Sequence, residues 1–453
     1  MLIKATHFRH YFFVLTLIFF ILRFFSFMRT DIGFDPYDSP SYFSPTWDSP
    51  IRMPIISYLF SFLEYFGAIV FVQTMIGIIA WIFLSYAISL LISSTTIKTI
   101  SSLLVYSLAL SSPIVAFDSI ILSESLTISF YNFTLAFLIL FFNNFRTISL
   151  FGIIVATIIY AGLKQSNAHF SIIILMFLFI YLILNHKSIN YKFVKVPAVS
   201  IAIMVNIFFI VIARENDEIN SNIEVTNIIE RSFDTYALQN YWLELGFPGI
   251  AYQTYSSFPL QPPIDETRSL PQVKAWEQFE KNSPIEIYAI KNLDFLILAP
   301  IAPKLFIPHF TDFESILSPL VRGYRLDQNR SLPNLASGSS DPFYLEDMNL
   351  PKTFWWQEKS NNSKLLFFIL IAPILLFLLL SIKISRKLPQ ASRHLIIFLL
   401  PINIVSIWAS WHISVNYEMA RYLMPWAISL RILFIVTSVV LLERLRKVWS
   451  SNT

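Results

Sequence analysis

Long apolar runs recur along the whole chain and constrain its fold more than any other feature. About ten stretches are continuous and close to the 20 residues that a helix needs to cross a bilayer. The predicted spans are Tyr11–Met28, Gly67–Ile92, Ile100–Phe117, Leu126–Phe142, Ile148–Leu163, Phe170–Leu184, Val196–Ala213, Leu365–Ile382, Leu395–Trp411 and Leu423–Leu442. The runs do not alternate with polar residues, which argues against transmembrane strands. The sequence therefore predicts an all-α polytopic membrane protein with about ten transmembrane helices.

The basic residues predict the orientation of these spans. Only 14% of the residues are charged against 55% hydrophobic, so the placement of the few cations is informative. Basic clusters precede the first span, separate the sixth from the seventh and the eighth from the ninth, and follow the tenth (Lys4 and Arg9; Lys187, Lys192 and Lys195; Lys383, Arg386, Lys387 and Arg393; Arg444, Arg446 and Lys447). With an even number of spans, all these clusters and both termini lie on one side, which we predict to be cytoplasmic.

The spans divide the chain into three parts. Residues 1–213 form a predicted N-terminal transmembrane module whose first outer loop covers residues 29–66, residues 214–363 form an extracytoplasmic loop region, and residues 364–453 hold the C-terminal helices. A connection as long as the middle part is expected to be functional or disordered, and its aromatic residues favour a folded layer. Tryptophans near the span ends are interpreted as an interfacial belt (Trp355, Trp356, Trp408, Trp411 and Trp426).

The first outer loop and the next outer turn concentrate carboxylates. The loop contains Asp38, Tyr42 and Arg52 and is expected to form short helices at the membrane surface. The turn before the fourth span adds Asp118 and Glu124. Taken singly, Asp38 is explained as a turn residue and Glu124 as a helix-capping residue.

Cations lie on the same predicted side. Lys164 ends the fifth span, and Glu418, Arg421 and Tyr422 stand at the start of the tenth. Lys164 alone is explained as a snorkelling side chain, and Glu418 with Arg421 as an i, i+3 pair. Taken together, the carboxylates and cations predict a functional site at the outer face, because charges at a membrane boundary are functional candidates by default.

Four short motifs resemble one family. They are Asp38-Ser39-x-x-Tyr42 with Arg52-x-Pro54 downstream, Ser123-Glu124, Gly162-Leu163-Lys164, and Arg421-Tyr422-Leu423-x-Pro425. In order and in predicted side they resemble the GT-C superfamily of integral-membrane glycosyltransferases, and are most similar to the branch with protein O-mannosyltransferases and lipid A aminoarabinose transferases. Two positions depart from the family: Ser39 follows Asp38 where a second acidic residue is frequent, and Lys164 stands where arginine is common.

The resemblance implies an inverting transfer from a polyprenyl-phosphate sugar to a hydroxyl of a lipid, glycan or protein acceptor at the extracytoplasmic face of a cell membrane, such as the bacterial inner membrane. It implies catalytic roles for Asp38, as general base, and for Glu124. The substrate-binding residues that it implies are Tyr42, Arg52, Lys164, Arg421 and Tyr422. A divalent cation, Mg²⁺ or Mn²⁺, held by Asp38 and Glu124 is compatible with it, although metal use varies across the superfamily.

Two other function classes stay open. An O-antigen polymerase or ligase would also have about ten or more spans and a large outer loop, and the candidate residues for it are His309, Arg322, Arg325 and Arg330. A transporter or flippase predicts charges at mid-membrane and broken helices. The charges singled out in the sequence lie at span ends instead, which ranks the transporter third.

Overall fold

The structure, a computed structural model, describes residues 2–29, 32–33, 42–43, 53–184, 192–214, 320, 355–356, 360–383, 390–413 and 419–452, without the side chains at some helix ends. The helices in this part of the chain are α1 (Leu2–Arg29), α2 (Pro54–Leu63), α3 (Phe66–Ser89), α4 (Thr95–Ala109), α5 (Ser112–Asp118), α6 (Glu124–Asn144), α7 (Thr147–Ala161), α8 (Gln165–Leu184), α9 (Lys192–Arg214), α18 (Ser360–Lys383), α19 (Gln390–Ile413) and α20 (Met419–Asn452). The prediction of an all-helical chain is confirmed for these residues.

Six of the described helices are long and apolar enough to cross a membrane: α1, α3, α6, α8, α9 and α20. The bent pair α4 and α5 makes a seventh candidate, and α7, α18 and α19 contain shorter apolar stretches. Each predicted span coincides with a helix or with the bent pair. A multi-pass membrane protein is therefore confirmed, whereas ten crossings and the GT-C arrangement stay predictions.

The predicted span Ile100–Phe117 is wrong in one respect, because the chain bends by 59° between α4 and α5. Pro113 occupies the second position of α5, and a proline there cannot continue the hydrogen bonds of a preceding helix. The Ser111 backbone is extended and begins a new helix, while its hydroxyl donates to the Leu108 carbonyl at 2.6 Å. The bend is thus explained by the Ser-Pro pair at this point.

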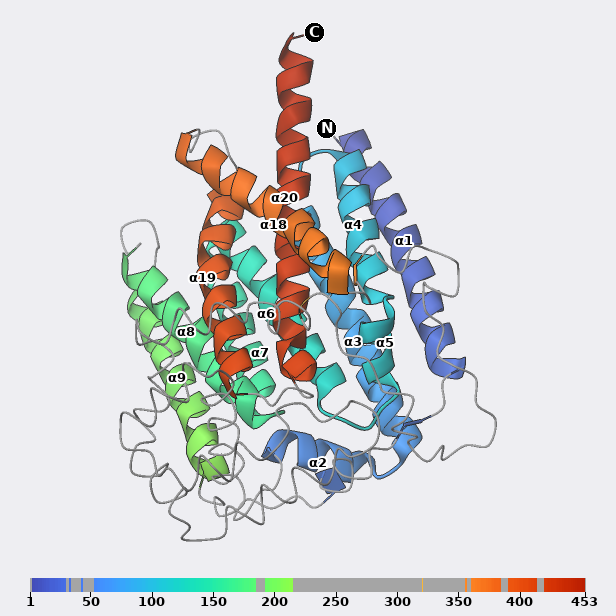
Figure 1. The fold of residues 1–453 in the computed structure, drawn as a ribbon, viewed down its shortest axis with the longest axis vertical. Coiled ribbons are helices and arrows are strands. Elements are labelled where there is room, and N and C mark those ends of the chain that lie inside the picture. Colours follow the sequence, from blue (N-terminus) through green and yellow to red (C-terminus); the bar gives the residue numbers. More distant parts are fainter. Residues whose placement is uncertain are drawn as a thin grey trace.

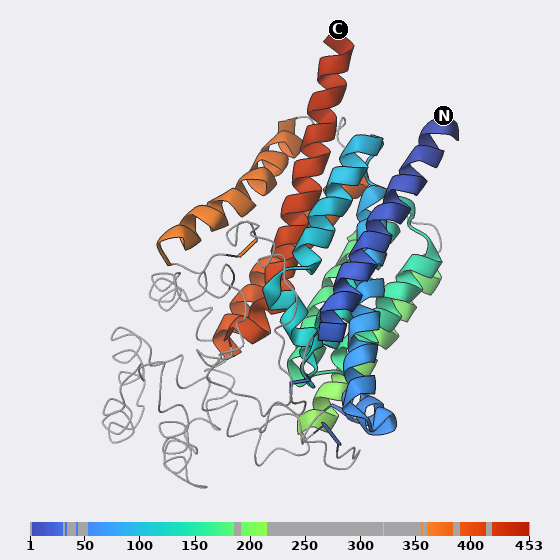
Figure 2. The same cartoon turned by 90° about the vertical axis from the view of Figure 1, so that its right-hand side faces the viewer.

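The long helices form a bundle in which both termini lie at the same end (Figure 1). Helix α2 lies across the opposite end, which we call the α2 end. Figure 2 shows α1 at one edge of the bundle and α18 leaning away at the other. Termini at one end agree with the predicted topology. Which side of the membrane they face stays a prediction.

A hydrophobic cluster at the α2 end holds the start of the first outer loop and α2 on the bundle. Tyr42, Ile56 and Phe60 are buried in it beside Ile121 and Leu122 of the turn between α5 and α6. Burying a large apolar side chain of this kind contributes about 1.5–3 kcal/mol. The cluster therefore fixes α2 over the turn that carries Glu124.

The interpretation of the tryptophans as an interfacial belt is wrong for Trp355, Trp356 and Trp426, which are buried in the bundle. The indole of Trp355 donates to Ser107 Oγ at 3.0 Å and that of Trp356 to Ser111 Oγ at 2.8 Å. The side chains of Trp408 and Trp411 lie outside the described part of the chain, as does nearly all of the loop region at residues 214–363. These hydrogen bonds satisfy the indole N–H groups of Trp355 and Trp356 inside the bundle.

Candidate functional site

The first outer loop docks on the turn between α5 and α6 through two described fragments. Gly33 pairs with this turn in parallel, its N–H donating to the Ser119 carbonyl at 2.8 Å and its carbonyl accepting from the Ile121 N–H at 3.0 Å. Further along the loop, the Tyr42 hydroxyl donates to Ser123 Oγ at 3.2 Å. Asp38 lies between these two fragments in the sequence, outside the described residues. The loop that carries the predicted base is therefore held against the turn that carries Glu124.

Glu124 is the first residue of α6 and forms an ion pair with Lys164, which stands between α7 and α8. Lys164 Nζ lies 3.0 Å from Glu124 Oε1. We call these two residues the α2-end pair. The Glu124 side chain is 4% exposed and that of Lys164 is 15% exposed, so the lysine is the more accessible member. The amino-terminal end of α6 also favours the carboxylate through the helix dipole. Glu124 is thus both a first-turn acidic residue of α6 and the partner of Lys164.

Close packing around the 162–164 turn positions the lysine. A Cβ atom at Gly162 would lie 2.6 Å from Cγ1 of Ile55 in α2, so only glycine lets α2 approach this closely. In the first turn of α8, the Asn167 amide donates to Thr127 Oγ1 of α6 at 2.9 Å. Helices α2, α6 and α8 thus fix the turn from three sides, which preorganises the Lys164 ammonium.

Helix α20 begins at the same end of the bundle as the α2-end pair (Figure 1). Trp426 packs edge-to-face on Tyr131 of α6 and Phe170 of α8, with ring centroids 5.2 and 5.1 Å apart. At a rise of 1.5 Å per residue, each ring lies about 8–10 Å along its own helix from one site residue. Trp426 is measured from Arg421, Tyr131 from Glu124 and Phe170 from Lys164. The backbone of Arg421 and Tyr422 is therefore at a depth similar to that of the pair. Their side chains lie outside the described part of the chain.

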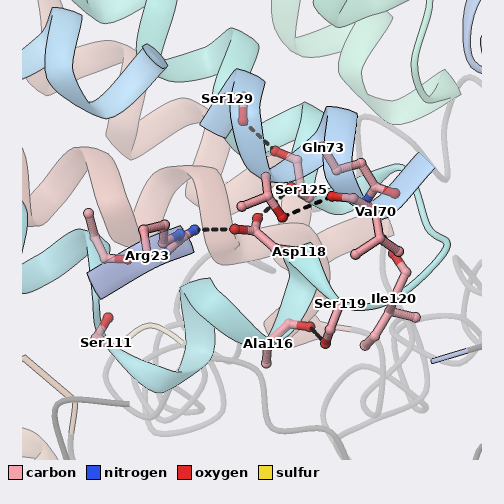
Figure 3. Close-up of polar contacts among 12 residues, drawn as sticks. Arg23, Val70, Gln73, Ser111, Ala116, Asp118, Ser119, Ile120, Ser125 and Ser129 are labelled. Atoms are coloured by element: carbon pink, nitrogen blue, oxygen red, sulfur yellow. Dashed lines mark hydrogen bonds and ion pairs between the residues drawn. The ribbon is translucent and has the colours of Figure 1, made fainter. Parts of the chain in front are cut away.

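The other predicted residues separate into two groups. Asp38 and Arg52 lie outside the described residues. Asp118, which sequence reasoning grouped with Glu124, pairs instead with Arg23 of α1, with Arg23 Nη2 at 2.7 Å from Asp118 Oδ2 (Figure 3). The two carboxylates thus have different cationic partners.

Sequence reasoning missed two arginines inside apolar spans. Arg23 of α1 and Arg431 of α20 are both fully buried, and both contact other segments of the bundle. A charged residue within an apolar span is itself a signal of structural or functional importance. This signal was available in the sequence and would have identified both residues.

The described residues do not gather three metal-ligating side chains of the His, Asp or Glu type. Glu124, the described member of the predicted metal-binding pair, has an ammonium partner, and a neighbouring cation disfavours a second one. Asp38, the other predicted metal ligand, lies outside the described residues, so no chemical step is derived through a divalent cation.

Comparisons of the chain with protein-family models, with curated proteins and with solved structures found no match. The functional proposal below therefore depends on the residues and their geometry.

Proposed function

We propose that the protein is a membrane glycosyltransferase that moves a sugar from a polyprenyl-phosphate donor to an acceptor hydroxyl at the α2 end. The observation that carries the proposal is the α2-end pair, an ammonium 3.0 Å from a buried carboxylate, beside the turn on which the first outer loop docks. Such a site combines a positive charge for an anionic leaving group with a loop that supplies a second carboxylate.

In the proposed step the acceptor oxygen attacks the anomeric carbon and the bond from that carbon to the phosphate oxygen breaks. The acceptor proton passes to Asp38, the general base implied by the resemblance. The electron pair of the broken bond leaves with the polyprenyl phosphate, which gains negative charge. Lys164 and Arg421 would stabilise this charge, Arg421 through its planar fork.

The described geometry supports the role of Lys164. The Lys164 side chain is 15% exposed and the Glu124 side chain is only 4% exposed, so an anion can approach the lysine without displacing the glutamate. Glu124 holds the ammonium in place, and a charge fixed in advance needs little reorganisation during the reaction. Glu124 thus acts in this proposal by orienting Lys164.

Tyr42 supports the same site by holding the loop. Its ring is buried against Phe60 of α2, with centroids 5.5 Å apart, and its hydroxyl reaches Ser123. Asp38 precedes Tyr42 by four residues in the sequence. Arg52 and Tyr422 stay proposed substrate-binding residues by resemblance, and a divalent cation stays an expectation of the same kind.

A transporter or flippase is the second candidate, because the α4–α5 bend and the buried Arg431 are features that it predicts. Both features have a structural explanation. Ser111 and Pro113 account for the bend, and Arg431 donates to backbone carbonyls. The cavity beside Arg23 and Asp118 has a volume of about 10 Å³, the space of one water molecule. For these reasons we rank the transporter below the transferase. The residues proposed for a polymerase or ligase lie outside the described part of the chain.

Binding of polyprenyl phosphate tests the proposal, because this molecule is the leaving group whatever the sugar. The purified protein in nanodiscs should bind polyprenyl phosphate more tightly than polyprenol, which lacks the phosphate. Lys164→Gln removes one charged hydrogen bond, worth about 1.5–3 kcal/mol, and should weaken phosphate binding by about ten- to hundredfold. Lys164→Arg should bind better than Lys164→Gln, since it keeps the charge.

Polyprenol binding provides the matched control. It should be equal in wild type and Lys164→Gln, because the substitution leaves the lipid contacts intact. Equal affinity of the wild-type protein for polyprenyl phosphate and polyprenol would contradict a donor site with cations, and unchanged phosphate binding in folded Lys164→Gln would remove this residue from it.

A further inference from the structure

The ion pair between Arg23 and Asp118 joins four helical segments at the α2 end. Arg23 belongs to α1 and is 1% exposed, and it also donates to the carbonyl of Ala109 at the end of α4. Asp118 ends α5 and accepts a hydrogen bond from the Ser125 hydroxyl of α6 at 2.6 Å. Figure 3 shows these side chains meeting between the helices.

The same two chain segments meet a second time. Ten residues after Arg23, Gly33 forms its backbone bridge with Ile120, two residues after Asp118. Gln73 of α3 holds the turn from its other side, with its amide donating to the Ile120 carbonyl at 3.1 Å and the Leu122 carbonyl at 3.3 Å. The end of α1 and the start of the turn are thus held together by a side-chain pair at one point and by the backbone at another.

Stability alone does not account for this ion pair. Taking two charges out of water is costly, and replacing a buried ion pair by apolar side chains of similar volume is often neutral or stabilising. A buried pair does fix relative positions, because its two charges accept few alternative partners in an apolar surrounding. The pair is therefore best explained by the geometry that it imposes.

We propose that Arg23 and Asp118 are positioning residues of the site: they hold the turn at residues 119–123 in register with the first outer loop, and so place Glu124 relative to the loop that carries Asp38. This inference rests on the proposed function for its catalytic consequence. The cavity beside the pair has a volume of about 10 Å³, the space of one water molecule, and in this proposal both residues act through the turn.

A disulfide between introduced cysteines measures the register directly. The natural chain has no cysteine, so Gly33→Cys with Ile120→Cys gives one defined pair, and bridged backbone positions fall within the distance range of a disulfide. The test background is the double variant Arg23→Met with Asp118→Leu. This double variant removes both members of the ion pair, so no charge is left buried without its partner, and the protein should fold.

In this background the thermal unfolding temperature should stay near that of the unsubstituted protein, while cross-linking at residues 33 and 120 should slow by about tenfold or more, the effect of 1.4 kcal/mol on the closed state. Sugar transfer from the polyprenyl-phosphate donor should fall in kcat, because Glu124 and the Lys164 ammonium that it orients are no longer held in register with the first outer loop. The matched control is Glu443→Gln with Lys447→Met, which removes an ion pair of 3.3 Å at the other end of the bundle and should leave cross-linking unchanged.

Unchanged cross-linking in the folded double variant would overturn the inference. So would slower cross-linking with unchanged kcat, since the register would then not matter to the site. A wild-type protein that transfers no sugar and binds no polyprenyl phosphate would refute the proposed function instead, and the cross-linking rates would then decide the role of the pair in positioning the turn.

Discussion

Replacing Arg431 by lysine should loosen the long loop from the bundle even though the charge is kept. Arg431 of α20 is fully buried and stacks on Trp356, with its guanidinium carbon 3.6 Å from the ring centroid. It donates twice to the Trp355 carbonyl, at 2.9 and 2.6 Å, and once each to Leu320, at 3.0 Å, and Ala427, at 2.8 Å. One side chain thus holds segments 320 and 355–356 against α20.

The magnitude follows from these contacts. A lysine has a single nitrogen and a different reach, so Arg431→Lys leaves at least one of the Trp355 and Leu320 carbonyls buried without its donor, at a cost of about 1–3 kcal/mol. Loss of the planar stack on Trp356 adds about 0.5–2 kcal/mol. The sum is about 1.5–5 kcal/mol, and the buried charge is not relieved because lysine retains it.

Cysteine labelling measures this loosening. A Leu320→Cys thiol, at a position only 2% exposed, reacts with a water-soluble maleimide only when the segment opens. In Arg431→Lys the labelling rate should rise by about 10- to 4000-fold, the equivalent of about 1.5–5 kcal/mol. Arg446→Lys, the same substitution at the exposed end of α20, should leave the rate unchanged. Equal rates in Arg431→Lys and wild type would refute the reasoning that Arg431 anchors the loop.

Two further substitutions test the packing. Gly162→Ala should destabilise the protein by about 1–3 kcal/mol, because the new Cβ collides with Ile55, and thermal unfolding should show the loss. Adding Ile55→Ala to this variant should restore part of the stability. No recovery would contradict the placement of α2 against Gly162. Glu443→Gln should cost about 0.5–2 kcal/mol, because its carboxylate accepts the Ser93 N–H at the start of α4 at 3.0 Å. Lys447→Gln, at the exposed member of the same pair, should change the unfolding temperature much less, and equal losses would contradict the capping role.

The helices could be predicted because a membrane-spanning segment has a strong local signal. Each predicted span corresponds to helical chain in the structure, since the apolar run itself determines the helix in a bilayer. The bend at Ser111 was not predicted, although Pro113 is visible in the sequence, because a proline inside an apolar run is also compatible with one kinked helix.

Partners could not be predicted because they come from distant parts of the chain. Glu124 and Lys164 were both identified as site residues, yet nothing in the sequence stated that they bond to each other. Asp118 was grouped with Glu124 by sequence proximity, whereas its partner Arg23 comes from another helix. The buried Trp355 was misassigned for a related reason: hydropathy near a span end does not distinguish a lipid interface from the interior of the bundle.

The most direct test of the central claim is sugar transfer by two aspartate variants of the first outer loop. Purified wild-type protein, Asp38→Asn and Asp48→Asn are compared with polyprenyl-phosphate mannose and polyprenyl-phosphate aminoarabinose as donors and with membrane extract as acceptor. Asp38→Asn should lower kcat by about a hundred- to ten-thousandfold, the usual effect of losing a general base, while Asp48→Asn stays close to wild type. Equal effects of the two substitutions, or full activity in Asp38→Asn, would contradict the account.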